Sequence, residues 1–153
     1  TEFTKADFQK VIDDKQVKAS EVKRVLLCSG KIYYDLLAKQ QTNKQMEIAI
    51  VRLEQLYPTP HKELEAIKTK YKKAKEFIWV QEEPENMGAW PYMCRKFISS
   101  DFNLGVISRE ESSSTATGYA KKHLQQQQHI IDQAFELVEK KHSSIDRKTQ
   151  TVN

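Results

Sequence analysis

The strongest fold signal in the sequence lies in residues 77–90, Phe77-Ile78-Trp79-Val80-Gln81-Glu82-Glu83-Pro84-Glu85-Asn86-Met87-Gly88-Ala89-Trp90. Residues 77–80 are aromatic or branched and apolar, which is typical of a strand buried on both faces. The residues that follow are carboxylates, a proline, an asparagine and a glycine, which predict a loop leading into a helix at Trp90. In an open α/β sheet, ligands and partners meet just beyond the carboxyl ends of the strands. The stretch therefore predicts both the centre of the core and the neighbourhood of any site.

Strands and helices alternate on both sides of this stretch. Apolar runs predict strands at 8–12 (a short edge strand), 22–28, 48–53 and 103–109. Apolar residues spaced by three or four predict helices at 31–41, 60–74 (with Thr59 as its N-cap), 90–98 and 120–140. Strands joined through helices of this length require crossover connections. The predicted fold class is therefore α/β, a three-layer α/β/α sandwich around a mostly parallel sheet.

Length and composition favour one compact domain. The chain has 153 residues, of which 39% are hydrophobic and 30% charged, and a net charge of +4. No apolar run approaches the roughly 18 residues that span a bilayer. The lysines between 68 and 75 are read as the solvated face and end of a helix, because no stacking aromatics or nucleic-acid-binding fingerprint accompanies them. We therefore expect neither a nucleic-acid partner nor a membrane partner.

The chain divides into three predicted parts. Residues 1–20 form an N-terminal connecting segment with the edge strand, 21–141 form the α/β domain, and 142–153 form a polar tail expected to be disordered. The first residue is Thr1, which looks like a cut point in a longer polypeptide. Cys28 and Cys94 lie in apolar patterns and are interpreted as reduced core residues, with a reactive thiol as the alternative.

Motifs for several kinds of chemistry are absent from the sequence. The strand before Ser29-Gly30 lacks the three glycines of a dinucleotide fingerprint, and there is no phosphate-binding lysine motif. The four histidines lack metal-ligand spacing, and no serine lies in a nucleophile elbow. The residues therefore predict no catalytic group, no bound cofactor and no metal ion in this chain.

Glu82 and Glu83 are the best candidates for proton chemistry, but an extended backbone points adjacent side chains to opposite sides. We therefore favour a structural or interface role for them. In that interpretation one carboxylate accepts hydrogen bonds from the following loop and the other meets a basic residue across an interface. Asn86 and Trp90 belong to the same candidate interface.

Arg52 and Arg109 each fall near the carboxyl end of a strand, and so on one rim of the sheet. Two guanidinium groups there could hold the phosphate groups of an effector. The hydroxyl-rich loop around Ser114, ahead of a helix, could add an anion-binding N-terminus. The alternatives remain open: ion pairs of the arginines with Glu54, Glu82 or Glu83, and a loop that only caps the helix.

Three phrases in the sequence resemble one family. They are 25–36 (VLLCSGKIYYDL), 49–58 (AIVRLEQLYP) and 81–90 (QEEPENMGAW), and residues 11–14, Thr117-Gly118, His123 and Gln125–Gln128 add to the match. They are similar to the C-terminal domain of the thiamine-diphosphate-dependent first component of the 2-oxoglutarate dehydrogenase complex. The resemblance covers about residues 8–138 and implies a transketolase C-terminal-like fold with five strands, one of them antiparallel.

The resemblance also implies a role for the chain. In this family the parent enzyme, of the tricarboxylic acid cycle, decarboxylates 2-oxoglutarate on thiamine diphosphate and magnesium. It then passes the succinyl group to lipoyl-lysine of the dihydrolipoyl succinyltransferase component. The cofactor and catalytic histidines belong mainly to preceding domains, so a fragment like this one is expected to be inactive and to supply interdomain and homodimer surface.

A regulatory role is the alternative that the resemblance leaves open, besides a pure dimerisation module. Some relatives bind AMP or acetyl-CoA near this domain, with an arginine at the position resembling Arg52. Lys10 stands where relatives often have proline, which puts any effector site using the N-terminal segment in doubt. A parent of this family would be cytoplasmic in a bacterium, which we favour, and in the mitochondrial matrix of a eukaryote.

Overall fold

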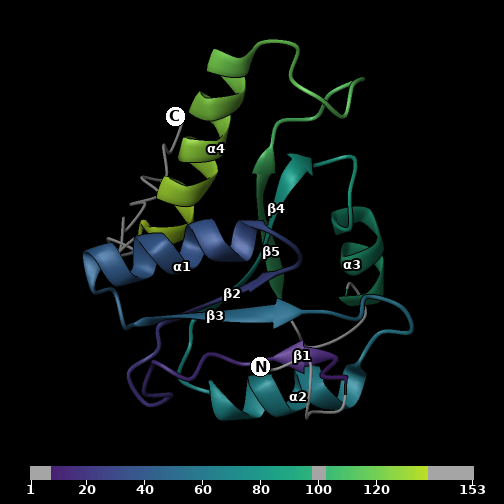
Figure 1. The fold of residues 1–153 in the computed structure, drawn as a ribbon. Helices are drawn as coiled ribbons and strands as arrows, with labels where there is room; N and C mark the ends of the chain where they lie inside the picture. The colour runs from purple at the N-terminus through teal and green to yellow at the C-terminus, as the bar shows by residue number, and fades with distance from the viewer. Residues whose placement is uncertain (1–7, 98–102, 138–153) are drawn as a thin grey trace, which may run out of the picture.

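A computed structural model describes residues 8–97 and 103–137 and shows a sheet between two pairs of helices (Figure 1). The elements, in chain order, are β1 (Val11–Ile12), β2 (Arg24–Cys28), α1 (Ile32–Asn43), β3 (Ile48–Leu53), α2 (His61–Lys70), β4 (Glu76–Pro84), α3 (Trp90–Phe97), β5 (Leu104–Arg109) and α4 (Ala120–Phe135). The strand order is β1-β3-β2-β4-β5. Among the described strands only β1 runs antiparallel to its neighbour, and the other pairs are parallel.

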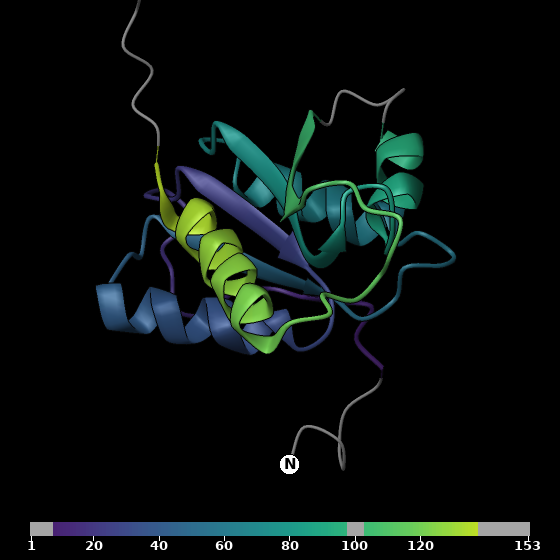
Figure 2. The same ribbon diagram turned by 90° about the horizontal axis from the view of Figure 1, so that it is seen from above.

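Two apolar clusters fill the space between the three layers. Because side chains alternate along a strand, β2 sends Val25 and Leu27 to one face and Leu26 and Cys28 to the other. Helices α2 and α3 cover the first face, and α1 and α4 cover the second (Figure 2). The predicted α/β/α sandwich with a mostly parallel five-stranded sheet is confirmed. The largest fully buried side chain is Trp79 of β4, in the middle of the stretch that predicted the core.

Strand β4 is longer than predicted. It continues from Val80 through Gln81, Glu82 and Glu83 to Pro84, which the sequence had placed in a loop. Pro84 pairs with Arg109 of β5 after a register irregularity that begins at Val80. The two carboxylates are acceptable here because Glu82 is partly exposed and Glu83 is exposed, whereas Gln81 and Pro84 remain buried.

Helix α2 corrects two further predictions. It begins at His61 and ends at Lys70, instead of running to residue 74. Pro60 is its N-cap residue and no side chain caps it, so the prediction of Thr59 as the N-cap is wrong. The Thr59 hydroxyl lies 2.7 Å from the hydroxyl of Tyr92 in α3 instead. A tertiary hydrogen bond has replaced the local one that the sequence favoured.

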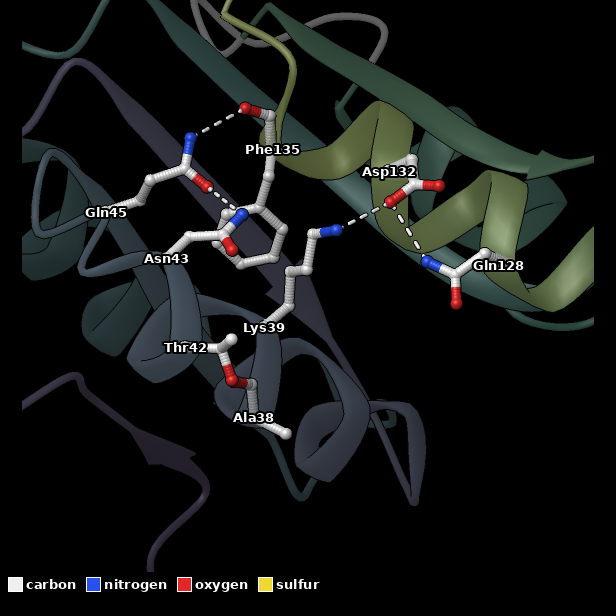
Figure 3. A network of polar contacts seen from close by, with 8 residues as sticks. All are labelled: Ala38, Lys39, Thr42, Asn43, Gln45, Gln128, Asp132 and Phe135. Atoms are coloured by element: carbon white, nitrogen blue, oxygen red, sulfur yellow. Dashed lines mark hydrogen bonds and ion pairs between the residues drawn. The ribbon is translucent and has the colours of Figure 1, made fainter.

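Helices α1 and α4, which cover the same face of the sheet, are joined by polar contacts (Figure 3). The ammonium of Lys39 lies 2.8 Å from the carboxylate of Asp132, which also accepts from Gln128. This contact lowers the pKa of Asp132 below its usual value, chiefly through the hydrogen bond from Lys39. Gln45 donates to the carbonyl of Phe135 at 3.1 Å, at the last turn of α4. The two helices therefore form a fixed layer.

The last turn of α4 is also capped from the sheet. Arg24, only 4% exposed, donates to the carbonyls of Gln133 and Ala134 at 3.1 and 3.0 Å. Its guanidinium also forms an ion pair with the carboxylate of Glu76, at 2.6 Å. A buried guanidinium at a helix C-terminus satisfies carbonyls that the helix itself leaves unpaired.

Candidate functional site

The carboxyl edge of the parallel strands carries the predicted site residues. Strands β2, β3, β4 and β5 end there at Cys28, Leu53, Pro84 and Arg109. The loops that follow these strands therefore lie along one edge of the sheet; in Figure 1 the loops after β4 and β5 leave the upper ends of these two strands. Two of these loops, after β4 and β5, are tied to each other and are described first.

Gln81, near the end of β4, organises the segment that follows this strand. Its side chain is 4% exposed. Its oxygen accepts from the indole of Trp79 and from the backbone N–H of Trp90, both at 2.9 Å. Its amide nitrogen donates to the carbonyls of Pro84 and Met87, at 3.0 and 2.8 Å. One buried amide thus holds the end of β4, the following turn and the start of α3 as a unit.

Gly88 is required by that arrangement. Its φ is +66°, in the left-handed region. A Cβ placed there would lie 3.0 Å from Cβ of Glu83 and 3.2 Å from the amide nitrogen of Gln81. The glycine therefore permits both the turn and the close approach of Gln81. We call residues 81–90 the platform.

Glu82 and Glu83 point apart, as an extended backbone requires. Glu82 forms an ion pair with Lys31, which precedes α1. This pair raises the pKa of Lys31 above its usual value, mainly through the hydrogen bond. Glu83 is exposed and contacts Gly88 on the other side. Two carboxylates that face away from each other cannot share a proton or a substrate, so cooperative acid–base chemistry is not supported by their geometry.

Asn86 and Arg109 join the platform to the loop after β5. Asn86 donates to the carbonyl of Ser112 at 3.0 Å and accepts from its N–H at 3.2 Å. Arg109 donates to the carbonyl of Glu82 at 2.6 Å. It also donates to the hydroxyl of Thr117 at 2.7 Å and the carbonyl of Thr115 at 2.6 Å. The arginine therefore folds the loop back onto the sheet.

Ser114 lies at the exposed tip of this loop, where its contacts are local. Its N–H donates to the hydroxyl of Ser112 at 3.2 Å, and its own hydroxyl donates to the carbonyl of Ala116 at 3.1 Å. Helix α4 starts at Ala120, with Tyr119 as an N-cap that makes no side-chain hydrogen bond. The structure brings Ser114 near Arg109 through the loop, and anion binding by the two remains a prediction.

Arg52 lies in another part of the edge. It belongs to β3, and two strands, β2 and β4, separate it from Arg109 in β5. At about 4.8 Å per strand, the two backbones lie about 14 Å apart. The Arg52 Nε is 2.6 Å from Glu54 Oε1, without a directed hydrogen bond, and the guanidinium carbon stacks 4.5 Å from the Tyr33 ring centre. The ion pair with Glu54, one of the alternatives from the sequence, is present.

Trp90 begins α3 beside an aromatic surface. The residue is half-buried and packs against the core cluster on the α2–α3 face. Tyr57, 79% exposed, contacts Tyr92 edge-on at a ring distance of 6.4 Å, and the Tyr57–Pro58 peptide is cis. Exposed aromatic rings on a rigid base are common in protein interfaces. The position of Trp90 and its neighbours is thus compatible with the interface role that the sequence favoured.

Within the described part of the chain, the cysteine, histidine and carboxylate side chains form no cluster that could act as a reaction centre. Cys28 is fully buried, and burial raises the pKa of its thiol to about 12, so it is held as an unreactive thiol. Cys94 is half-buried, less enclosed than predicted, and makes no disulfide. Among residues 8–97 and 103–137 no cluster of histidine, cysteine or carboxylate side chains could hold a metal ion. In the same ranges no helix has the length and apolar character to cross a bilayer.

Gln81 is the residue that the sequence reasoning missed. Glutamine has no strong positional preference, and the charged pair beside it gives the stronger local signal. A signal was present: Gln81 shares a strand face with Trp79, whose indole needs an acceptor when buried, and Gly88 follows within loop distance.

Comparison with known proteins shows which family the sequence matches. The sequence profile of a family described as 2-oxoglutarate dehydrogenase C-terminal matches residues 1–135. The oxoglutarate dehydrogenase of Buchnera aphidicola is 43% identical over 141 residues, which cover 90% of this chain. The 2-oxoglutarate dehydrogenase E1 components of Cupriavidus necator and Haemophilus influenzae are 41% and 39% identical, each over 88% of the chain. The chain spans only about 15% of the length of each of these relatives.

Among solved structures, a 2-oxoglutarate:ferredoxin oxidoreductase from Magnetococcus marinus is similar, with a TM-score of 0.51. The match covers 81% of this chain and 20% of that chain, at 9% sequence identity. At this identity the similarity concerns the fold alone, which is consistent with the transketolase C-terminal-like architecture expected from the sequence. That structure contains 2-oxoglutarate, coenzyme A and succinyl-CoA.

Proposed function

Because the chain belongs to the 2-oxoglutarate dehydrogenase C-terminal family, we propose that it is the C-terminal interface domain of a 2-oxoglutarate dehydrogenase. The observation that carries this proposal is the platform. Residues 81–90 are fixed at the carboxyl edge by a buried amide and a required glycine, yet their carboxylates diverge and form no reaction centre. A rigid polar surface without its own chemistry suits a contact with another part of an enzyme.

The reaction itself is proposed for the parent enzyme. It would decarboxylate 2-oxoglutarate oxidatively and transfer the succinyl group to a lipoyl-lysine. Among the described residues no group of three histidine, cysteine, aspartate or glutamate side chains could hold a metal ion. As the family resemblance implies, thiamine diphosphate and magnesium would be held by other parts of the parent.

The partners are proposed on the same basis. The carboxyl edge would contact the preceding domains of the same polypeptide and the second subunit of a homodimer, and the parent would work with a dihydrolipoyl succinyltransferase. Glu83 is the group we assign to such a contact, because it is exposed and makes no ion pair among the described residues. The named relatives are bacterial proteins, which favours a bacterial cytoplasm as the location of the parent.

A domain exchange tests the proposal. Residues 8–137 of this chain would replace the matching segment of the Haemophilus influenzae E1 component, which is 39% identical. We expect the chimera to oxidise 2-oxoglutarate with an artificial electron acceptor, and this chain alone to give no turnover. Glu83→Arg in the chimera should lower the rate, whereas Glu65→Arg, a matched charge reversal on exposed α2, should not. An active isolated chain, or equal rates for the two variants, would refute the interface role.

A cavity favours a second, regulatory function. A cavity of about 170 Å³ at the carboxyl edge is lined by Arg52 and Lys15, with Tyr33, Asp13 and Asp14. Sites for whole small molecules are usually about 300 Å³ or larger, so this cavity is large enough for a phosphate group and not for a nucleotide. Calorimetry with AMP and acetyl-CoA on the chimera and on its Arg52→Ala variant distinguishes the two functions. Heat that disappears in the variant supports an effector site, and no heat at millimolar ligand argues against one.

A further inference from the structure

A groove runs along the flank of α4 that faces the outer edge of β5. Its volume is about 420 Å³. Helix α4 contributes residues spaced by three or four, so that they form one stripe: Lys122, Gln125, Gln126, His129, Ile130 and Gln133. Strand β5 and the residue after it contribute Ser108, Arg109 and Glu110. From Lys122 to Gln133 the helix rises about 16 Å, so the groove is long and narrow.

The strand beside the groove has an open edge. β5 is the last strand in the sheet order, and its only neighbour among the described strands is β4. An outermost strand presents a row of unpaired backbone N–H and C=O groups. Such a row is the usual template for the addition of an extended peptide. Five residues of extended chain would span about 16 Å, the length of the groove along α4. On the sheet side the groove is bordered by Ser108 and Arg109, so the peptide would pair with the carboxyl end of β5.

The lining of the groove is cationic and rich in amides. Among the residues that the structure describes, Arg109 donates to two carbonyls and a hydroxyl and makes no ion pair, so no described carboxylate neutralises it directly. Within the described part of the chain, Lys122 makes no ion pair, and the side chains of Gln125 and Gln133 make no hydrogen bond. Glu110 is the single carboxylate that lines the groove. The balance of charge favours an acidic occupant, and the free amides match the polar groups of a peptide.

We propose that this groove, between the open edge of β5 and the flank of α4, binds an extended acidic peptide segment of a partner protein. The segment would continue the sheet by pairing its backbone with β5, while its carboxylates meet Lys122 and Arg109. A small anion would use only the Arg109–Lys122 end and would leave the amides and the strand edge unpaired. The site lies apart from the cavity at Arg52, because two strands, β2 and β4, lie between β3 and β5. It does not depend on the identity of the parent enzyme.

The test uses the 153-residue chain and blocked pentapeptides of known sequence. The probe alternates glutamate and valine, and its control alternates lysine and valine. Binding is followed by amide chemical shifts in nuclear magnetic resonance during titration. We expect the acidic peptide to shift the amides of β5 and of the groove flank of α4, and the basic peptide to shift them far less. The affinity should fall as salt is raised, because the charge contacts are exposed.

Two variants make the test specific. Lys122→Glu reverses a charge inside the groove and should weaken the acidic peptide about fivefold, the effect of losing one exposed charge contact and adding a repulsion. Lys121→Glu makes the same change on the adjacent residue, which does not line the groove, and should leave the affinity unchanged. Both lysines are exposed, so both variants should fold, and their circular dichroism spectra verify it.

Three results would overturn the proposal. They are no shift at millimolar acidic peptide, equal binding of the basic peptide, and equal weakening by both lysine variants. Inorganic phosphate is titrated as a further arm. If phosphate alone shifts the same β5 amides and displaces the peptide at equal concentration, the groove is a small-anion site and the peptide proposal is wrong.

Discussion

The two edges of the sheet, at β1 and at β5, differ in how far the chain supplies hydrogen-bond partners to the backbone groups along them. At the β1 edge, the backbone carbonyl of Lys10 accepts hydrogen bonds from the N–H groups of Glu54 and Gln55. Val11 and Ile12 pair with β3. Beyond the end of β1, the carboxylate of Asp14 replaces a backbone acceptor and accepts a hydrogen bond from the N–H of Ile50 at 3.0 Å. A side chain thus continues the ladder that a strand of two residues cannot complete.

Asp13 and Asp14 also attach this edge to both helical layers. Asp14 accepts from Gln40 of α1 at 3.0 Å. Asp13 accepts from the hydroxyl of Tyr71, just after α2, at 2.7 Å and pairs with Lys70. Adjacent side chains on extended backbone point to opposite faces, so two consecutive carboxylates can reach two layers. The β5 edge has no such attachment among the described residues, which is why it can accept a further strand.

The largest expected effect comes from Asp14→Ala. The change leaves the buried N–H of Ile50 without its acceptor and removes one of two acceptors from the amide of Gln40. We expect the free energy of unfolding to fall by about 3 kcal/mol, the cost of unpaired buried donors. Urea denaturation measures the change. Asp14→Asn keeps one oxygen and should lose less, and a loss below about 1 kcal/mol for the alanine variant would contradict the role of Asp14 in the ladder.

The two edges should respond differently to the same substitution by lysine. Val11 packs against the core cluster, so Val11→Lys should cost about 1.5 kcal/mol of unfolding free energy. Ser108 lies on the open β5 edge, so Ser108→Lys should change stability by no more than about 0.5 kcal/mol. The same denaturation experiment compares the two variants. Equal losses would mean that the β5 edge is as closed as the β1 edge.

Tyr71→Phe should cost about 1 kcal/mol at pH 7, because it removes the hydrogen bond to Asp13. Burial of the phenol, together with its bond to Asp13, raises the pKa of Tyr71 above its usual value. The folded protein therefore keeps the proton where the unfolded chain releases it, so this stability is present below about pH 10 and is lost as the pH rises further. The difference in stability between wild type and variant should shrink above pH 10. A constant difference would show that the pKa of Tyr71 is not raised in the folded protein.

The smallest effect concerns local opening rather than global stability. Amides of β3 that pair with β1 should exchange with solvent more slowly than the outward-facing amides of β5, by at least about tenfold. Hydrogen–deuterium exchange followed by nuclear magnetic resonance measures both sets in one sample. Addition of the acidic peptide should then slow exchange at β5 and leave β3 unchanged. Uniform protection across the sheet would remove the distinction between the edges.

The local pattern predicted the regular elements well and the site only in part. Apolar runs located β2 and β3, and the spacing of apolar residues located all four helices. The divergence of Glu82 and Glu83 followed from strand geometry and is present. The extension of β4 to Pro84 does not follow from the local pattern, because charged residues after an apolar run predict a loop, whereas the strand continues through them. Thr59 was assigned to a cap because its partner in α3, Tyr92, lies 33 residues away.

By itself the sequence determined the α/β class, the order of the elements and the family, because these depend on local periodicity and on contiguous motifs. Only the tertiary structure decided which polar groups meet. It separated Arg52 from Arg109 by two strands, placed Gln81 at the centre of the platform and left the β5 edge open beside α4. The physical reason is that these contacts join residues far apart in the chain. Their partners are therefore fixed by strand order and packing, which local periodicity does not encode.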